Sequence, residues 1–173
     1  MTSAADILLL EGAEAAAAID GLAGVLADCV AGGASVSFMS PFTHADAAAY
    51  FRRVVAEVER GDTALLGARL NGRIVGTVQL GLDTPPNQPH RADVKKMLVH
   101  RDFRRRGIGE ALMHGIEEEA RKRGRTVLVL DTASGDAERL YARSGWQRAG
   151  TVPDYALWPD GGLCATTFFW KRV

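Results

Sequence analysis

The sequence has few of the features that mark secreted, metal-binding or membrane proteins. Its only two cysteines, Cys29 and Cys164, lie far apart and form neither a disulfide framework nor a zinc-binding spacing. The four histidines are scattered, so we expect no metal. No apolar run approaches the roughly 18 residues of a transmembrane helix, and the alanine-rich N-terminus, which contains Asp6 and Glu11, lacks a signal-peptide pattern. These absences predict a cytoplasmic protein.

The sequence also has no net charge at neutral pH, because 21 lysines and arginines balance 21 aspartates and glutamates. Nothing electrostatic then favours a nucleic acid or an anionic membrane as a partner. The 173 residues are 47% hydrophobic and 24% charged, which is ordinary for a globular protein, and no repeat or linker divides them. We therefore expect a single domain over residues 1–173, acting as a monomer or a homodimer.

The most informative stretch runs from Val94 to Gly124. Residues 94–99 form an apolar strand pattern, a polar arginine-rich loop follows, and Arg104-Arg-Arg-Gly-Ile-Gly109 opens an amphipathic helix. Opposite charges lie four residues apart on the face assigned to solvent, at Glu117/Arg121, Glu118/Lys122 and Glu119/Arg123. Gly124 is a stop signal. This order predicts a strand, a loop and a helix.

Such a loop can bind a phosphate group. The first backbone N–H groups of a helix have no internal partner, and the helix dipole favours negative charge there. Gly107 and Gly109 would let a phosphate approach the backbone closely, and arginine side chains supply further donors. The alternative is a solvated basic turn before an ordinary helix. The loop is neither a Walker A loop nor a dinucleotide fingerprint, because it lacks the residues that each requires.

Hydrophobic periodicity and turn residues divide the rest of the chain. Asn71-Gly72 is a strong hairpin signal, and residues 151–165, with two prolines and Gly161-Gly162, predict a long loop. The expected elements are strands at 7–10, 64–70, 73–82, from about 91, 126–131 and 166–171, and helices at 13–31, 43–61, after the arginine loop and near 136–144. This order predicts a mixed α/β domain.

Two motifs together resemble the GNAT superfamily of N-acyltransferases. Arg104-x-x-Gly107-x-Gly109 after a strand resembles its acyl-CoA pyrophosphate signature, and the segment 137–146, with Leu140-Tyr141 followed by Gly145-Trp146, resembles a later motif. The resemblance implies a central, mixed, mostly antiparallel sheet flanked by helices. It also implies acetyl-CoA as the acetyl donor and residues 104–109 (Arg104, Arg105, Arg106, Gly107, Ile108 and Gly109) as the pyrophosphate anchor.

The same resemblance assigns further donor contacts. A backbone N–H at Leu98 or Val99 would polarise the thioester carbonyl, while the side chains remain free to pack in the core. Tyr141 occupies the position of a tyrosine that protonates the departing thiolate; the alternative is a ring packed on the helix with its hydroxyl in water. Ser134 stands where many family members have an asparagine that contacts the pantetheine arm, and its hydroxyl offers a weaker contact.

Acetyl transfer also needs a base for the amine proton, and two carboxylates are candidates. Asp131 ends one predicted strand and Asp93 begins its neighbour, so both can lie near the thioester. The alternatives are a helix-cap or turn role for Asp131 and a solvated strand end for Asp93.

Three segments, 32–39, 90–99 and 151–161, also resemble the tabtoxin-resistance acetyltransferase group. That group acetylates a small β-lactam amino acid and has active-site carboxylates that match Asp93 and Asp131. Simple loop packing is the alternative for each residue that this resemblance places around the acceptor pocket: Ser35, Phe38, Met39, Tyr155 and Trp158.

We therefore expect an acetyl-CoA-dependent N-acetyltransferase whose partner is a small-molecule amine, amino-acid-like or antibiotic-like, with a possible role in toxin resistance. Two alternatives stay open. A non-catalytic acyl-CoA sensor would keep the fold, and a protein N-terminal acetyltransferase would need an open, acidic groove in place of a closed pocket.

Overall fold

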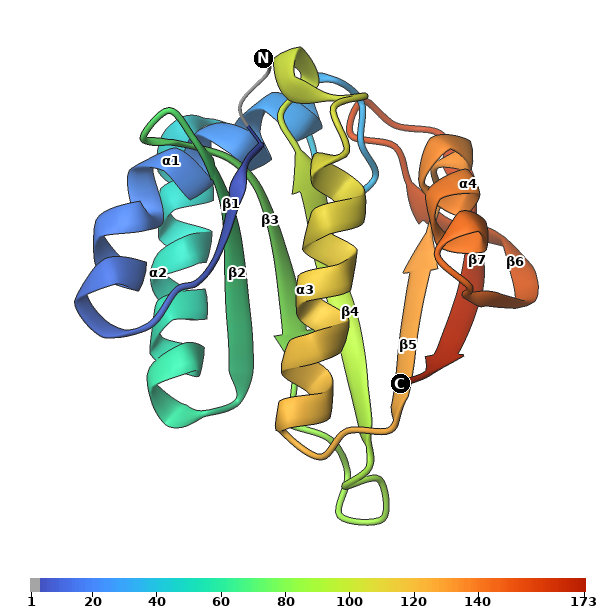
Figure 1. Cartoon of the computed structure of the whole chain (residues 1–173). Helices are drawn as coiled ribbons and strands as arrows, with labels where there is room; N and C mark the ends of the chain where they lie inside the picture. The colour runs from blue at the N-terminus through green and yellow to red at the C-terminus, as the bar shows by residue number, and fades with distance from the viewer. Residues whose placement is uncertain (1–3) are drawn as a thin grey trace.

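A computed structural model of the chain describes residues 4–173 and contains one seven-stranded sheet. The strand order is β1-β2-β3-β4-β5-β7-β6, and only β4 and β5 run parallel. Helices cover both faces of the sheet (Figure 1). The predicted fold class, a mixed and mostly antiparallel sheet flanked by helices, is confirmed.

The N-terminal half follows the predicted pattern closely. Its elements are β1 (Asp6–Leu9), α1 (Gly12–Ala31), α2 (His44–Arg60), β2 (Thr63–Leu70) and β3 (Arg73–Gly81). Thr43 and Asp46 form a capping box that starts α2. Asn71 and Gly72, with φ of 51° and 77°, both adopt the left-handed conformation that a type I′ hairpin turn requires. The predicted hairpin is confirmed.

The stretch from Val94 to Gly124 also forms the predicted strand, loop and helix. It consists of β4 (Arg91–Val99), a 3-10 turn (Arg101–Phe103) and α3 (Ile108–Lys122), followed by β5 (Val127–Thr132) and α4 (Gly135–Arg143). Gly124, with a φ of 70°, lies just past the end of α3.

The predicted loop at residues 151–165 is wrong. Most of it belongs to a hairpin of β6 (Gln147–Leu157) and β7 (Leu163–Arg172). β6 is an edge strand and nearly all of it is exposed, so its sequence shows no buried alternation. Its register with β7 shifts between Val152 and Ala156, around Pro153 and Asp154. A proline in a bulge of an edge strand removes no ladder bond, which explains why a strand contains loop-type residues.

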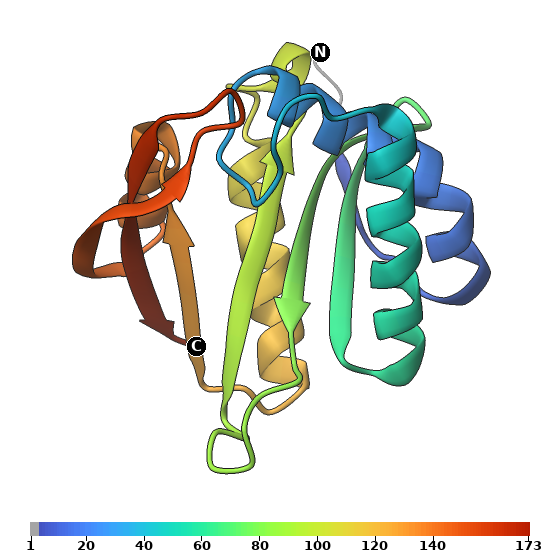
Figure 2. The same cartoon turned by 180° about the vertical axis from the view of Figure 1, so that it is seen from behind.

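Two apolar layers flank the sheet. Residues of α1 and α2 pack with Leu65 and Leu98 on one face, and residues of α3 and α4 pack with Leu66 and Leu128 on the other. Figures 1 and 2 show the two helix layers from opposite sides.

The charged face predicted for α3 needs one correction. Glu117 and Glu119 are buried, at 5% and 7% exposure, whereas Glu118 is exposed. The Glu117 carboxylate accepts hydrogen bonds from Trp146 Nε1 at 3.0 Å and Lys171 Nζ at 2.7 Å, so it links α3 to β7. Sequence spacing identified its i,i+4 arginine but could not show these long-range partners.

We predict that Glu117→Ala lowers the free energy of unfolding by about 3 kcal/mol, because it leaves the Trp146 N–H without its acceptor and the Lys171 ammonium without its carboxylate partner, with only the Ser144 carbonyl remaining. Urea denaturation measures this. Glu118→Ala, on the exposed neighbour, is the matched control and should change stability by less than about 0.5 kcal/mol. Equal losses in the two variants would contradict the role assigned to Glu117.

Candidate active site

The site is organised around the divergence of β4 and β5. The two strands pair with each other only at Arg91↔Val127, Ala92↔Leu128 and Asp93↔Val129. Beyond these residues β4 pairs only with β3 and β5 only with β7. A bulge in β4 explains the divergence: its register with β3 shifts by one residue near Lys96, whose φ is 52°. Figure 2 shows the two strands separating toward their C-terminal ends. Backbone groups of β4 therefore face an opening instead of a strand.

The register decides which of the predicted backbone donors faces this opening. The His100 N–H donates to the Val75 carbonyl of β3 at 2.9 Å. Because N–H directions alternate along an antiparallel strand, the N–H of Val99 points away from β3 and toward the opening, whereas that of Leu98 points to β3. By the same alternation we expect the N–H of Met97 to face the opening too, which sequence reasoning missed.

The arginine loop ends at a helix N-terminus that has no side-chain cap. Gly107 is the N-cap of α3 with a φ of 76°, and the first N–H to find a partner inside the helix is that of Ala111, which donates to the Gly107 carbonyl. The preceding amides, including those of Ile108 and Gly109, are therefore available to an anion. This geometry fits a phosphate group.

The three arginines of the loop differ in what they contact. Arg104 donates through Nε to the Val99 carbonyl at 3.1 Å and lies 3.7 Å from Cys29 Sγ, so it braces the loop against the end of β4. Arg106 donates to the Asp102 carbonyl. Arg105 is exposed and forms no side-chain hydrogen bond or ion pair with residues 4–173. Of the three loop arginines, Arg105 is therefore the one whose side chain has no partner within residues 4–173 and stays free for a ligand.

Asp28, at the end of α1, fastens the start of this loop. Its carboxylate accepts hydrogen bonds from the Arg101 backbone N–H at 2.8 Å and from Arg101 Nε at 3.0 Å. Burial raises the pKa of Asp28, but these hydrogen bonds outweigh it and the net pKa is lowered. The folded protein therefore holds Asp28 as a carboxylate.

We predict that Asp28→Asn lowers the free energy of unfolding by about 2 kcal/mol at neutral pH, because charged acceptors make the stronger hydrogen bonds. The folded pKa is below the unfolded value, so this stabilisation is present above the unfolded pKa of about 3.9 and disappears as the pH falls through the folded pKa. Urea titrations of both proteins between pH 7 and pH 3 should show the difference shrinking. A difference independent of pH would contradict this account.

Tyr141 lies on α4, the helix that approaches the start of α3 at Gly109. It is 5% exposed, and its ring packs against Trp146 and Phe169 with centroids 6.1 and 5.7 Å away. Its hydroxyl makes no hydrogen bond with residues 4–173. Burial raises the pKa of Tyr141, and the negative charge of Asp131 raises it further. The phenol therefore stays protonated and can act as a proton donor.

α3 and α4 approach each other next to the arginine loop. A Cβ added at Gly109 would lie 3.2 Å from Leu140 Cδ2, so glycine permits this contact. Ser134 is the N-cap of α4, and its hydroxyl accepts from the Ala137 N–H at 3.4 Å. This is a capping role, and the pantetheine contact of Ser134 stays a prediction.

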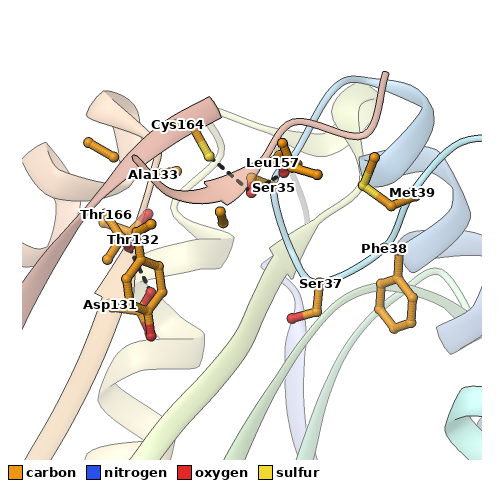
Figure 3. A pocket seen from close by; sticks show the side chains of 13 residues that line it. Ser35, Ser37, Phe38, Met39, Asp131, Thr132, Ala133, Leu157, Cys164 and Thr166 are labelled. Carbon is orange, nitrogen blue, oxygen red and sulfur yellow. Dashed lines mark hydrogen bonds between the residues drawn. The ribbon is translucent and has the colours of Figure 1, made fainter. Parts of the chain in front are cut away.

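A cavity of about 390 Å³ lies beside Asp131 (Figure 3). The loop after α1 is tied to the β6–β7 hairpin there: Ser35 Oγ donates to the Leu157 carbonyl at 2.9 Å, and Cys164 Sγ donates to Ser35 Oγ at 3.4 Å. The lining residues are Ser35, Ser37, Phe38, Met39, Asp131, Thr132, Ala133, Tyr155, Ala156, Leu157, Cys164, Ala165 and Thr166. The cavity is therefore built from segments that are far apart in the sequence.

Four of the five predicted acceptor-pocket residues line this cavity, namely Ser35, Phe38, Met39 and Tyr155. Trp158 does not; its backbone belongs to the turn between β6 and β7, where its N–H donates to the Gly162 carbonyl. The lining from β7 was missed because its first residues were assigned to a loop.

The two candidate bases have different surroundings. Asp131 lines the cavity, is exposed, and accepts a hydrogen bond from Thr166 Oγ1 at 2.7 Å. Asp93 lies on β4 opposite Val129, does not line the cavity, and pairs with Arg91 Nη1. The structure thus places Asp131, and not Asp93, at the cavity wall.

Residues 4–173 contain neither a metal-binding cluster nor a membrane-spanning helix. No cluster of three or more histidine, cysteine, aspartate or glutamate side chains is arranged to bind a metal ion. Within the same residues, no helix has the length and apolarity to cross a membrane.

Comparison with known proteins identifies the family. A sequence model of the Acetyltransferase (GNAT) family matches residues 33–146, which is more than half of the chain. The chain belongs to the GNAT acetyltransferase family. The match includes the divergent strand pair, the arginine loop and Tyr141, so the GNAT resemblance is confirmed, while the tabtoxin-resistance subgroup is not.

Individual relatives of this GNAT protein agree on the fold. An IAA acetyltransferase from Azospirillum brasilense is 35% identical over 101 residues, covering 57% of this chain and 63% of that protein. An N-acetyltransferase from Staphylococcus aureus Mu50 superposes with a TM-score of 0.81 at 21% identity, covering 98% and 99% of the two chains. A phosphinothricin acetyltransferase from Sinorhizobium meliloti, solved with AcCoA, gives a TM-score of 0.80 at 15% identity, with coverage of 99% and 89%. The chain thus spans under two thirds of the curated relative.

Proposed function

We propose that this GNAT protein transfers an acetyl group from acetyl-CoA to the amine of a small molecule. The single observation that carries the proposal is the position of Asp131. It lines the cavity that would hold the acceptor, and its charge acts on the Tyr141 hydroxyl. A candidate proton acceptor and a candidate proton donor are thus close enough to interact electrostatically, and acyl transfer to an amine requires one of each.

The donor side fits acetyl-CoA. Uncapped amides at the start of α3 and the free side chain of Arg105 suit a pyrophosphate, and the absence of a side chain at Gly107 lets it approach. Acetyl-CoA, when bound, supplies an acetyl thioester. The Val99 and Met97 amides that face the opening are hydrogen-bond donors for a carbonyl oxygen on which negative charge develops.

The chain's own residues would move the protons. Asp131 accepts a proton from the attacking amine, directly or through a water molecule, while Thr166 holds its carboxylate in place at 2.7 Å. Tyr141 keeps its proton because its pKa is raised, and it donates that proton to a departing thiolate. Asp93 remains the second candidate base, although its pairing with Arg91 competes with that role.

The acceptor side favours a small molecule. The cavity is about 390 Å³, and one side of its rim is bridged by the hydrogen bond from Ser35 Oγ, in the loop after α1, to the Leu157 carbonyl of β6. Asp131 is the one acidic side chain among the lining residues, so the cavity is not the acidic groove expected for a protein N-terminus. An amino-acid-like or antibiotic-like amine suits it, and detoxification of such a compound is the role that follows.

Thiol release from acetyl-CoA tests the proposal. Purified protein is assayed against amino acids, β-lactam amino acids, aminoglycosides, polyamines and a peptide with a free N-terminus. We expect acceptor-stimulated release with one of the small-amine classes and none with the peptide. Stimulation by the peptide alone would overturn the small-molecule assignment, and saturable acetyl-CoA binding without release for any acceptor would favour a sensor.

A further inference from the structure

Two strained residues meet at the edge of the acceptor cavity. Lys96, in the β4 bulge, has a φ of 52°, and Ser37, in the loop after α1, has a φ of 82°. Left-handed backbone is unfavourable for residues other than glycine and persists where the surrounding structure enforces it, often at functional sites. Lys96 Nζ donates a hydrogen bond to Ser37 Oγ at 3.0 Å. The two left-handed residues are thus joined by a hydrogen bond from an ammonium group at the cavity edge.

Among residues 4–173 the Lys96 ammonium has no anionic partner. Lys96 is half-buried, yet within residues 4–173 no carboxylate lies within 4 Å of its Nζ. Its nearest partners are Ser37 Oγ and the ring of Phe38, whose centroid lies 5.7 Å from Nζ. Burial lowers the pKa of Lys96, the positive charge of Lys95 lowers it further, and Asp131 partly opposes both effects. A partly desolvated cation of this kind gains stability from any anion brought beside it.

The cavity has a negative charge at its wall and a positive charge just behind its opposite side, because Asp131 lines the cavity and Lys96, which does not line it, contacts two residues that do. Ser37 and Phe38, which Lys96 contacts, line one side, and Asp131 lies across from them (Figure 3). Asp131 and Lys96 do not form an ion pair with each other, although the charge of Asp131 acts on Lys96. A zwitterionic amino acid matches this arrangement, with its amine toward Asp131 and its carboxylate toward Lys96.

We propose that Lys96 binds the carboxylate of an amino-acid acceptor and thereby selects amino acids over uncharged amides and polyamines. The inference rests on the proposed acetyl transfer and narrows its substrate class. Most of the remaining lining is apolar, including Phe38, Met39 and Leu157, so amino acids with apolar side chains fit the cavity best. Lys96 then determines specificity without taking part in proton transfer.

The test compares apolar L-amino acids with their primary amides, which differ only at the carboxylate. Wild-type protein should show a higher kcat/KM for the acids. Lys96→Met keeps an unbranched side chain, shorter only by the terminal amino group, and removes the charge. It should lower kcat/KM for the acids by about 10- to 100-fold, mainly through KM, as expected on losing a charge-assisted hydrogen bond. It should leave kcat for the amides nearly unchanged, and Lys96→Arg should retain part of the preference.

Ser37→Ala is the matched control, because it removes the Nζ–Oγ hydrogen bond and leaves the charge. It should weaken the preference for acids less than Lys96→Met does. Equal losses for acids and amides in Lys96→Met would show that Lys96 only supports the loop and would overturn the inference. Wild-type protein that acetylates no amine would reject the proposed function itself, whereas equal use of acids and amides rejects only the carboxylate site.

Discussion

Replacing Tyr141 with phenylalanine should lower kcat by about 100-fold while leaving the affinity for acetyl-CoA unchanged. The variant keeps the ring that packs on Trp146 and Phe169 and removes only the hydroxyl, which makes no hydrogen bond with residues 4–173. The fold should therefore be intact, and the loss is confined to proton donation to the thiolate. Steady-state thiol release gives kcat, and calorimetry gives the dissociation constant for acetyl-CoA.

Tyr155→Phe is the matched control for this variant. Tyr155 also carries a phenol near the site, but it is 52% exposed on β6 and lines the acceptor cavity. Removing the Tyr155 hydroxyl should leave kcat unchanged and should at most raise KM for the acceptor. If Tyr141→Phe retained the full kcat, Tyr141 would be a packing residue, and the catalytic role drawn from the family resemblance would be wrong.

The second large effect is expected for Asp131→Asn. An asparagine can still accept the hydrogen bond from Thr166 Oγ1 but cannot take a proton from an amine, so kcat/KM for the acceptor should fall by about 100-fold or more. Removing this negative charge should also lower the pKa of Tyr141, since Asp131 helps to raise it. The kinetic measurement is thiol release at saturating acetyl-CoA over a range of acceptor concentrations.

Asp93→Asn separates the two candidate bases. Asp93 pairs with Arg91 and does not line the cavity, so its replacement should cost far less than that of Asp131. Thr166→Val adds a second comparison, because it removes the hydrogen bond that orients the carboxylate and keeps the carboxylate itself. A larger loss in Asp93→Asn than in Asp131→Asn would reverse the assignment of the base.

Most of the fold could be predicted because helices, strands and turns are determined largely by residues close together in the sequence. The apolar stripe of α2, the Asn71-Gly72 turn and the loop from β4 into α3 each follow from spacing and turn chemistry. The edge strand β6 was missed because it is exposed along most of its length and contains a bulge at Pro153. An exposed bulged strand has the composition of a loop.

The site was less predictable where it depends on long-range contacts. Nothing in the sequence indicated that Lys96 adopts a left-handed conformation, because lysine has no preference for it, so the bulge and the ammonium it aims at Ser37 were not foreseen. Glu117 was assigned to solvent for the same reason: its partners, Trp146 and Lys171, are distant in the sequence. Asp131 was found because it ends a recognisable buried strand.

The most direct test of the account is a calorimetric titration of acetyl-CoA into wild-type protein and into Arg105→Glu. Arg105 is exposed and, within residues 4–173, forms no side-chain hydrogen bond or ion pair, so its replacement should not disturb the fold. We predict saturable 1:1 binding to wild-type protein and at least about tenfold weaker binding to the variant, because the new carboxylate repels the pyrophosphate. Failure of wild-type protein to bind acetyl-CoA, or equal affinity in the two proteins, would contradict the assignment of the arginine loop as the donor site.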